Sequence, residues 1–294
     1  MNIHEFVDNF SMSIAGKTVK KKYFSKNVSS RKVKDWFEVL MLEIPSIDGE
    51  GHHRIKVEHD GCVHVAGIHI DQWQGKDYPT IIYHHGAAEG SYDFSFKRIL
   101  SKHKSDIKAN LIGIQALFNQ SNKEFMDSIS NLSNYTMMLA ASVLMVEQII
   151  KNLRQTSDSK ITVTGTSLGG FVTNLHFTYF NSADRYVPLL AGARIGDALM
   201  DSAYSNVMSE YGKSHSGDII EILNFDEDFG KRNQDNLFPL LASYDQIVKY
   251  SVQSQDYEKS QLESIPFGHS TGATRYSLLR QHILKHIALC PLGG

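Results

Sequence analysis

The chain has 294 residues, of which 41% are hydrophobic and 21% are charged, and its formal net charge is −2. This length suits one large domain with a sizeable core, and the composition is ordinary for a soluble globular protein. The balanced charge and the lack of a long basic run argue against a nucleic-acid-binding protein. The two cysteines, Cys62 and Cys290, lie far apart in the sequence, which argues against a disulfide framework and favours a reducing compartment.

The start of the chain shows no pattern of a targeting segment. The sequence MNIHEFVDNFSMS lacks a basic start followed by an apolar core, so we expect no signal peptide. No apolar run approaches the roughly 18 residues that a membrane span requires. We therefore expect a cytoplasmic protein with no membrane span and no nucleic-acid partner.

Residues 1–54 are interpreted as an N-terminal extension. Apolar residues at helical spacing predict a helix over 33–42. From Ile55 onward the pattern changes to alternation, which continues on both sides of Asp60-Gly61. An Asp-Gly pair between two alternating apolar runs predicts a β-hairpin.

From about residue 80 onward, short apolar strands alternate with helical patterns. The expected strands are 80–83, 111–117, 161–164, 186–190 and 238–242, and the expected helices are 95–103, 137–153, 171–180 and 275–289. This rhythm predicts an α/β fold with a mostly parallel sheet and helices on both faces. Ligands in such sheets bind outside the carboxyl ends of the strands. We therefore assign residues 55–294 to one α/β domain.

Residues 194–236 interrupt this alternation. They contain a helical stretch over 195–211, an apolar run over 219–223 and the acidic cluster 226–228. We interpret the segment as a small, mostly helical lid over the site. The alternative is an ordinary crossover helix followed by a loop.

The most informative stretch is 160–171, KITVTGTSLGGF. A β-branched strand runs into a tight turn with the pattern Gly-x-Ser-x-Gly, formed by Gly165, Ser167 and Gly169, and a helix follows. Glycines on either side of the serine let strand and helix approach closely. The turn presents the Ser167 hydroxyl at the edge of the sheet and places the Leu168 amide at a helix N-terminus, where it can face a developing oxyanion. The alternative is a glycine-rich turn without chemistry.

A serine hydroxyl becomes a good nucleophile only with a base to take its proton and a carboxylate to orient that base. Asp245 follows one expected strand, 78 residues after Ser167 (245 − 167), and His269 follows the next strand-like run, 24 residues later (269 − 245). Each therefore falls in a loop at a strand end. Asp245 could instead cap a helix N-terminus, although we favour the role of orienting carboxylate, and the acidic cluster 226–228 offers competing carboxylates.

Other histidines offer competing roles. His84 is close enough in sequence to line a pocket, and His282 and His286 have the i, i+4 spacing of a metal-binding pair. Ile283 follows His282, so the glutamate of the zinc-protease helix motif is missing. We interpret His282 and His286 as non-ligand residues and predict neither a metal nor a cofactor.

Together these motifs resemble a known family. In chain order they are His85-Gly86, the 165–170 turn, the 239–248 segment and Gly268-His269. Over roughly residues 55–290 the chain is similar to the serine-type α/β-hydrolases, which place nucleophile, acid and histidine in this order. It departs from many members at 242–244, Ala-Ser-Tyr, where those members have a glycine shortly before the acid.

The resemblance implies a role for each site residue. Ser167 is the expected nucleophile, His269 the general base and then acid, and Asp245 the orienting carboxylate. The expected oxyanion hole consists of the backbone amides of Leu168 and Ala87.

The function expected from this resemblance is hydrolysis of a carboxylic ester through an acyl-enzyme. A serine peptidase or acyl-peptide hydrolase would use the same three residues, and a binding protein that retains the fold is the third hypothesis. The expected partner is a small-molecule ester or amide. The oligomeric state is not encoded in any motif of the sequence.

Overall fold

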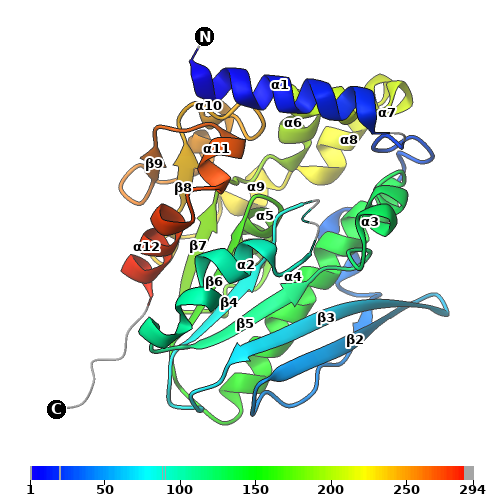
Figure 1. Cartoon of the computed structure of the whole chain (residues 1–294). Coiled ribbons are helices and arrows are strands. Elements are labelled where there is room, and N and C mark those ends of the chain that lie inside the picture. The colour runs from blue at the N-terminus through cyan, green and yellow to red at the C-terminus, as the bar shows by residue number, and fades with distance from the viewer. Residues whose placement is uncertain (1, 20, 88, 90, 288–294) are drawn as a thin grey trace.

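The computed structural model describes residues 2–19, 21–87, 89 and 91–287. Within this part of the chain, the strands form one sheet in the order β1-β2-β3-β5-β4-β6-β7-β8-β9 (Figure 1). The strands are β1 Met41–Leu42, β2 Gly51–His59, β3 Cys62–Gln72, β4 Thr80–His84, β5 Asn110–Gln115, β6 Ile161–Thr166, β7 Arg185–Leu189, β8 Leu240–Ala242 and β9 Glu263–Ile265.

The sheet is antiparallel at one side and parallel elsewhere. β1, β2, β3 and β5 pair antiparallel, and β5, β4, β6, β7, β8 and β9 pair parallel. The predicted hairpin is confirmed: Asp60 (φ 48°) and Gly61 (φ 74°) both take left-handed backbone conformations between β2 and β3. Such a two-residue turn matches the twist of the strands that it joins.

Helices cover both faces of the parallel part. The helices, with η marking 3₁₀ turns, are α1 Ile3–Thr18, η1 Val33–Trp36, α2 Phe94–Ile99, η2 Ser101–Asp106, α3 Asn122–Ser128, α4 Leu132–Arg154, α5 Leu168–Tyr179, α6 Ile195–Met200, η3 Ala203–Val207, α7 Glu210–Ser214, α8 Ser216–Leu223, α9 Asp226–Phe229, α10 Tyr250–Gln253, η4 Ser254–Asp256, α11 His269–Ala273 and α12 Tyr276–His286. Neighbouring residues of β4 point to opposite faces. Ile81 joins the core beneath α2 and α12, whereas Ile82 joins the larger core beneath α4 and α5. The predicted α/β architecture with both faces covered is therefore confirmed.

The helix predicted over 33–42 is wrong. Residues Val33–Trp36 form a short 3₁₀ turn, and Met41–Leu42 form the edge strand β1. Trp36 is buried because it packs against another element: its indole Nε1 donates to Thr136 Oγ1 of α4 at 3.0 Å. The apolar residue at this position therefore serves packing against α4 and does not mark one face of a helix.

Two other predicted helices end earlier than expected. The helix predicted over 95–103 divides into α2 and η2, with non-helical backbone at His103. The last helix, predicted over 275–289, ends at His286, and residues 288–289 lie outside the described residues.

Helix α1 lies within the N-terminal extension, where the sequence pattern did not predict a helix. The helix begins with a capping box in which the Asn2 side chain accepts from the His4 amide and Glu5 reaches back to the Asn2 amide. Figure 1 shows α1 lying across the edge of the molecule that also carries α6 and α11. The helix packs against η3 and α11.

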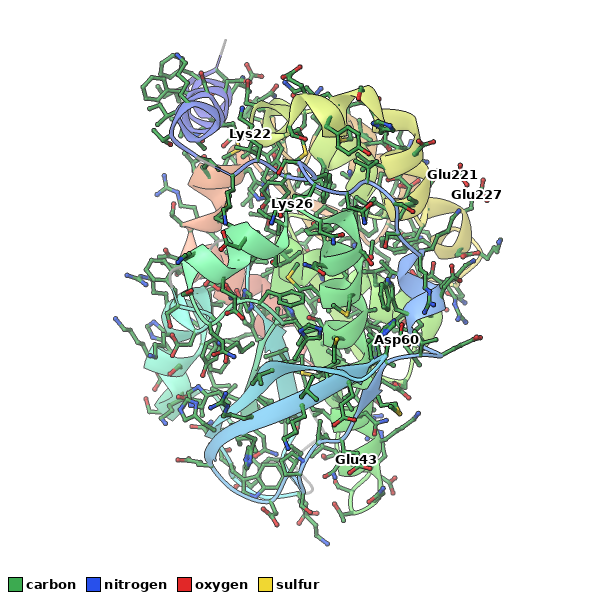
Figure 2. All side chains as sticks on the ribbon, turned by 90° about the vertical axis from the view of Figure 1, so that its right-hand side faces the viewer. Lys22, Lys26, Glu43, Asp60, Glu221 and Glu227 are labelled. Carbon is green, nitrogen blue, oxygen red and sulfur yellow. The ribbon has the colours of Figure 1, made fainter. Side chains whose placement is uncertain are left out.

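The segment 194–236 forms α6, η3, α7, α8 and α9. Arg194, at the start of this segment, forms salt bridges with two carboxylates. Its Nη2 lies 2.9 Å from Asp226 Oδ2 and 2.8 Å from Asp256 Oδ1. Figure 2 shows Glu221 and Glu227 on the outer side of this segment, directed away from the sheet. That the segment acts as a lid stays a prediction.

Helix α4 has the length and composition of a membrane span. Its most apolar 18-residue stretch has a mean hydropathy of 1.2, so the prediction that no apolar run approaches this length is wrong. However, 78% of that stretch is buried inside the protein, where α4 packs on the sheet as a core helix. Such a buried helix is weak evidence for a membrane span.

Candidate active site

The strand–turn–helix predicted around Ser167 is confirmed. β6 ends at Thr166, α5 begins at Leu168, and Ser167 between them has φ 56° and ψ −110°. This conformation is costly for a residue with a side chain, and such strain concentrates at functional sites.

The glycines around Ser167 are required by close backbone contacts. A Cβ on Gly165 would lie 2.5 Å from the Gly169 carbonyl carbon, and one on Gly169 would lie 2.0 Å from the His84 oxygen. Side chains at these positions would therefore push the helix away from the strands. This is the steric role that the sequence pattern predicts.

The structure brings together the three residues that were expected to act together. Ser167 Oγ lies 2.9 Å from His269 Nε2, and His269 Nδ1 lies 2.7 Å from Asp245 Oδ2. Each follows the carboxyl end of a parallel strand: Ser167 follows β6, Asp245 follows β8, and His269 follows β9 and begins α11. They form a continuous chain of hydrogen bonds from a buried carboxylate to the serine hydroxyl.

Asp245 has both of the roles that the sequence left open. Its Oδ1 accepts from the amides of Ile247 (2.8 Å) and Val248 (2.6 Å), as a capping residue would, and its Oδ2 accepts from His269. One carboxylate is therefore fixed by its own loop and orients the histidine at the same time.

The competing acids 226–228 lie elsewhere. Asp226 pairs with Arg194, and Asp228 accepts from Lys34 (3.0 Å) and Lys231 (2.8 Å). Glu227 is exposed. None of the three is hydrogen-bonded to His269 in the described part of the chain.

Burial and charge act in opposite directions on His269. Burial lowers the pKa of the imidazole, but the charge and hydrogen bond of Asp245 outweigh burial, so the pKa of His269 lies above its ordinary value. Burial also raises the pKa of Asp245, and the hydrogen bonds from His269 and the Val248 amide oppose this rise. The arrangement favours an imidazolium beside a carboxylate, the state in which a general base has taken up a proton.

Both residues of the expected oxyanion hole border the serine. Ala87, Leu168 and Ser167 line one cavity of about 30 Å³. The rest of its wall is mostly apolar and comes from Tyr135, Phe171, Ala198, Leu199, Tyr204, Ile247 and Val248. Leu168 is the first residue of α5, so its amide is one of the helix N–H groups that have no partner within the helix.

The loop that carries Ala87 is fixed by His85. The buried His85 ring accepts from the Ala116 amide at Nε2 (3.2 Å), so its other nitrogen, Nδ1, carries the proton and donates to the Gly86 carbonyl (2.6 Å). Burial lowers the pKa of His85 to about 4, so the ring is neutral near pH 7. His84 does not line the cavity, because its Nε2 bonds to Ser142 of α4 (2.9 Å).

Glu89 also holds this loop. Its side chain is partly buried and accepts from the Gly86 amide at 2.6 Å. It also accepts from the Ser95 amide (2.8 Å) and hydroxyl (2.7 Å) at the start of α2. Glu89 therefore ties the oxyanion loop to α2, and its position three residues after Gly86 is the signal that could have suggested this.

The two C-terminal histidines do meet a carboxylate. Glu263, His282 and His286 each place one possible ligand atom within 4.8 Å of the others. However, Glu263 Oε1 accepts from Lys285 Nζ at 2.7 Å, and His282 Nε2 donates to the Phe238 carbonyl at 3.0 Å. Lys285 therefore already places a positive charge beside the Glu263 carboxylate. That no metal binds here stays a prediction.

Neither a model of a known protein family nor a curated protein matches the sequence. Solved structures do match the fold. An acylaminoacyl peptidase of Pyrococcus horikoshii has a TM-score of 0.58 at 12% identity over 85% of this chain and 44% of its own. Acetyl xylan esterase 1 of Thermoanaerobacterium sp. JW/SL YS485 has a TM-score of 0.53 at 12% identity, over 97% of this chain and 98% of its own. Est1E of Butyrivibrio proteoclasticus, with ferulic acid bound, has a TM-score of 0.57 at 16% identity, over 80% of this chain and 99% of its own.

These likenesses and the strand order show that the chain has the α/β-hydrolase fold. At 12–16% identity they carry the fold alone. The chain also spans less than half the length of the acylaminoacyl peptidase that it matches.

Proposed function

We propose that this protein is a serine hydrolase that cleaves a carboxylic ester through an acyl-enzyme. The observation that carries the proposal is the hydrogen-bonded chain from Asp245 through His269 to Ser167, on a strained turn beside two candidate oxyanion amides. A serine and a histidine that were merely packed together would need neither the strained turn nor the buried carboxylate.

In the proposed mechanism, Ser167 Oγ attacks the acyl carbon while His269 Nε2 takes its proton. Asp245 holds the imidazole with Nδ1–H toward its carboxylate and stabilises the imidazolium. The amides of Leu168 and Ala87 donate to the oxyanion, each worth on the order of 3 kcal/mol in the transition state. The imidazolium then protonates the leaving alcohol, and a water activated by His269 releases the acid.

The cavity beside Ser167 favours a small acyl group. Its volume of about 30 Å³ is about two to three times what one water molecule needs, and its wall is mostly apolar. An acetyl group suits this space better than a long fatty acyl chain. We therefore propose short-chain esters as the preferred substrates.

A peptidase or acyl-peptide hydrolase is the second candidate, because one similar structure is an acylaminoacyl peptidase. An amide has a poorer leaving group than an ester, so amide cleavage places greater demands on His269 as the acid. For both reactions we propose chemistry carried by Ser167, His269 and Asp245, with neither a metal nor a cofactor.

We also propose a cytoplasmic location and no nucleic-acid partner. In the described part of the chain, Cys62 is an exposed free thiol, which suits a reducing compartment.

The proposal is tested by steady-state hydrolysis of p-nitrophenyl acetate, butyrate and octanoate beside acetyl-alanine p-nitroanilide. We expect kcat/KM to be highest for acetate, to fall with chain length, and to be lost in Ser167→Ala. Ester turnover that persists in folded Ser167→Ala would refute the proposal. A preference for the anilide would favour the peptidase.

A further inference from the structure

Helix α1 places a carboxylate inside the protein next to the candidate base. Asp8 is the one buried residue of α1, at 0% exposure. Its Oδ2 accepts from the His269 amide at 2.7 Å and from the Gln246 amide at 3.2 Å, and its Oδ1 accepts from the Ser270 amide at 2.9 Å. A buried carboxylate is costly unless hydrogen bonds compensate it, and here three backbone donors do so.

These donors belong to the two loops that carry the acid and the base. Gln246 directly follows Asp245, and the other two amides are the first two of α11, which begins at His269. Asp8 therefore caps α11 from another element, 261 residues away in the chain from His269. One side chain fixes the backbone of both loops relative to each other.

The residues around Asp8 also allow α1 to pack closely against the loop that carries His269. A Cβ on Gly268 would lie 2.6 Å from Asp8 Oδ2 and 2.8 Å from the His4 carbonyl, so only glycine lets α1 approach this closely. His4 Nδ1 also bonds to Thr271 Oγ1 at 3.0 Å, and its ring packs edge-on against Phe267 at 5.2 Å. The inner face of α1 is thus built against the histidine loop.

We propose that Asp8 is a positioning residue that holds His269 within hydrogen-bonding reach of both Ser167 and Asp245. The inference rests on the proposed function. Asp8 contacts the backbone of His269 and not the reacting atoms, so it acts through that histidine. The N-terminal extension therefore contributes a residue that positions His269.

Asp8 also acts on His269 through its charge. The charged and titratable groups that face the histidine and its loop are Asp245 from the loop after β8, Asp8 and His4 from α1, and Arg275, whose guanidinium lies 4.5 Å from the centre of the Phe267 ring. Burial lowers the pKa of His269, Asp245 raises it most, and Asp8 raises it further. Removing the charge of Asp8 would therefore lower the pKa of His269.

The test compares Asp8→Asn with Asp184→Asn in the full chain. Asp184 is a matched control, because its carboxylate also accepts a backbone amide, that of Ile161 at 2.9 Å, but at the opposite end of β6 from Ser167. For Asp8→Asn we expect kcat for p-nitrophenyl acetate to fall on the order of 10- to 100-fold, because a shifted base loses its alignment, with little change in KM. The acid limb of the kcat/KM profile should move to lower pH, and Asp8→Glu, which returns the charge, should move it back.

A second measurement does not depend on turnover. The pKa of His269 is followed by NMR titration of its ring signals, assigned by their loss in His269→Gln, and the midpoint should fall in Asp8→Asn but not in Asp184→Asn. Equal activity losses in the two variants together with an unchanged His269 midpoint would overturn the proposal. If wild-type protein hydrolyses no ester, the proposed function fails, and the titration alone then decides whether Asp8 acts on His269.

Discussion

Replacing Asp245 with asparagine tests how His269 is held in the correct protonation state. In the wild-type protein Asp245 Oδ1 accepts from the Ile247 and Val248 amides, and Oδ2 accepts from His269 Nδ1. An asparagine in the same place keeps its single oxygen toward the two backbone donors, because an NH₂ group there would face two N–H groups. Its NH₂ group then points at His269 Nδ1 and can only donate to it.

That reversal forces the imidazole proton onto Nε2, the nitrogen that lies 2.9 Å from Ser167 Oγ. A protonated Nε2 cannot take the serine proton. We expect kcat to fall by a factor on the order of 10⁴, which corresponds to about 5.5 kcal/mol of transition-state stabilisation. Stability should change much less, because the backbone hydrogen bonds of the loop remain.

The assay is steady-state hydrolysis of p-nitrophenyl acetate, with circular dichroism to confirm folding. Asp226→Asn is the control, since Asp226 is a carboxylate that pairs with Arg194 away from His269. A loss of less than tenfold in Asp245→Asn, or an equal loss in Asp226→Asn, would refute the assignment of the orienting acid.

Three further predictions concern the turn, the base and the oxyanion loop. Gly169→Ala should lower the free energy of unfolding by about 3 kcal/mol or more, because the new Cβ would lie 2.0 Å from the His84 oxygen. The melting temperature measured by calorimetry should fall accordingly. Gly49→Ala is the control and should have little effect, since open space surrounds Gly49. The kcat/KM profile should fall as pH decreases through a midpoint above 6.5, because the base must be neutral and the pKa of His269 is raised; a midpoint clearly below 6.5 would contradict this. Glu89→Gln should lower kcat on the order of tenfold by loosening the oxyanion loop, and unchanged kcat would show that this loop needs no such support.

The sequence was sufficient to predict the parts of the site that depend on local geometry. The turn around Ser167 is specified by neighbouring glycines, and the loops of Asp245 and His269 follow strands that end at one edge of the sheet. The missing glycine before the acid has a structural explanation. Ser243 and Tyr244 form a turn whose amides donate to the Ile265 and Phe267 carbonyls, and neither residue has a positive φ, so the turn does not require a glycine.

The role of α1 could not be predicted in this way. Its exposed face carries large apolar residues, among them Phe6 and Phe10, so its pattern does not show which face is buried. Its one buried side chain, Asp8, is polar, and its three partners lie 238 to 262 residues away. Glu89 was missed for a related reason, because its burial depends on the fold of its own loop.

The most direct test of the account is to label the protein with a fluorophosphonate probe and locate the adduct by peptide mass mapping. Ser214 provides an internal control, because its hydroxyl lies 3.1 Å from His215 Nδ1 on exposed α7, without the buried acid and the strained turn that accompany Ser167. We predict an adduct on Ser167 alone, lost in Ser167→Ala and retained in Ser214→Ala. An adduct on another serine, or none on folded wild-type protein, would contradict the claim that Ser167 is an activated nucleophile.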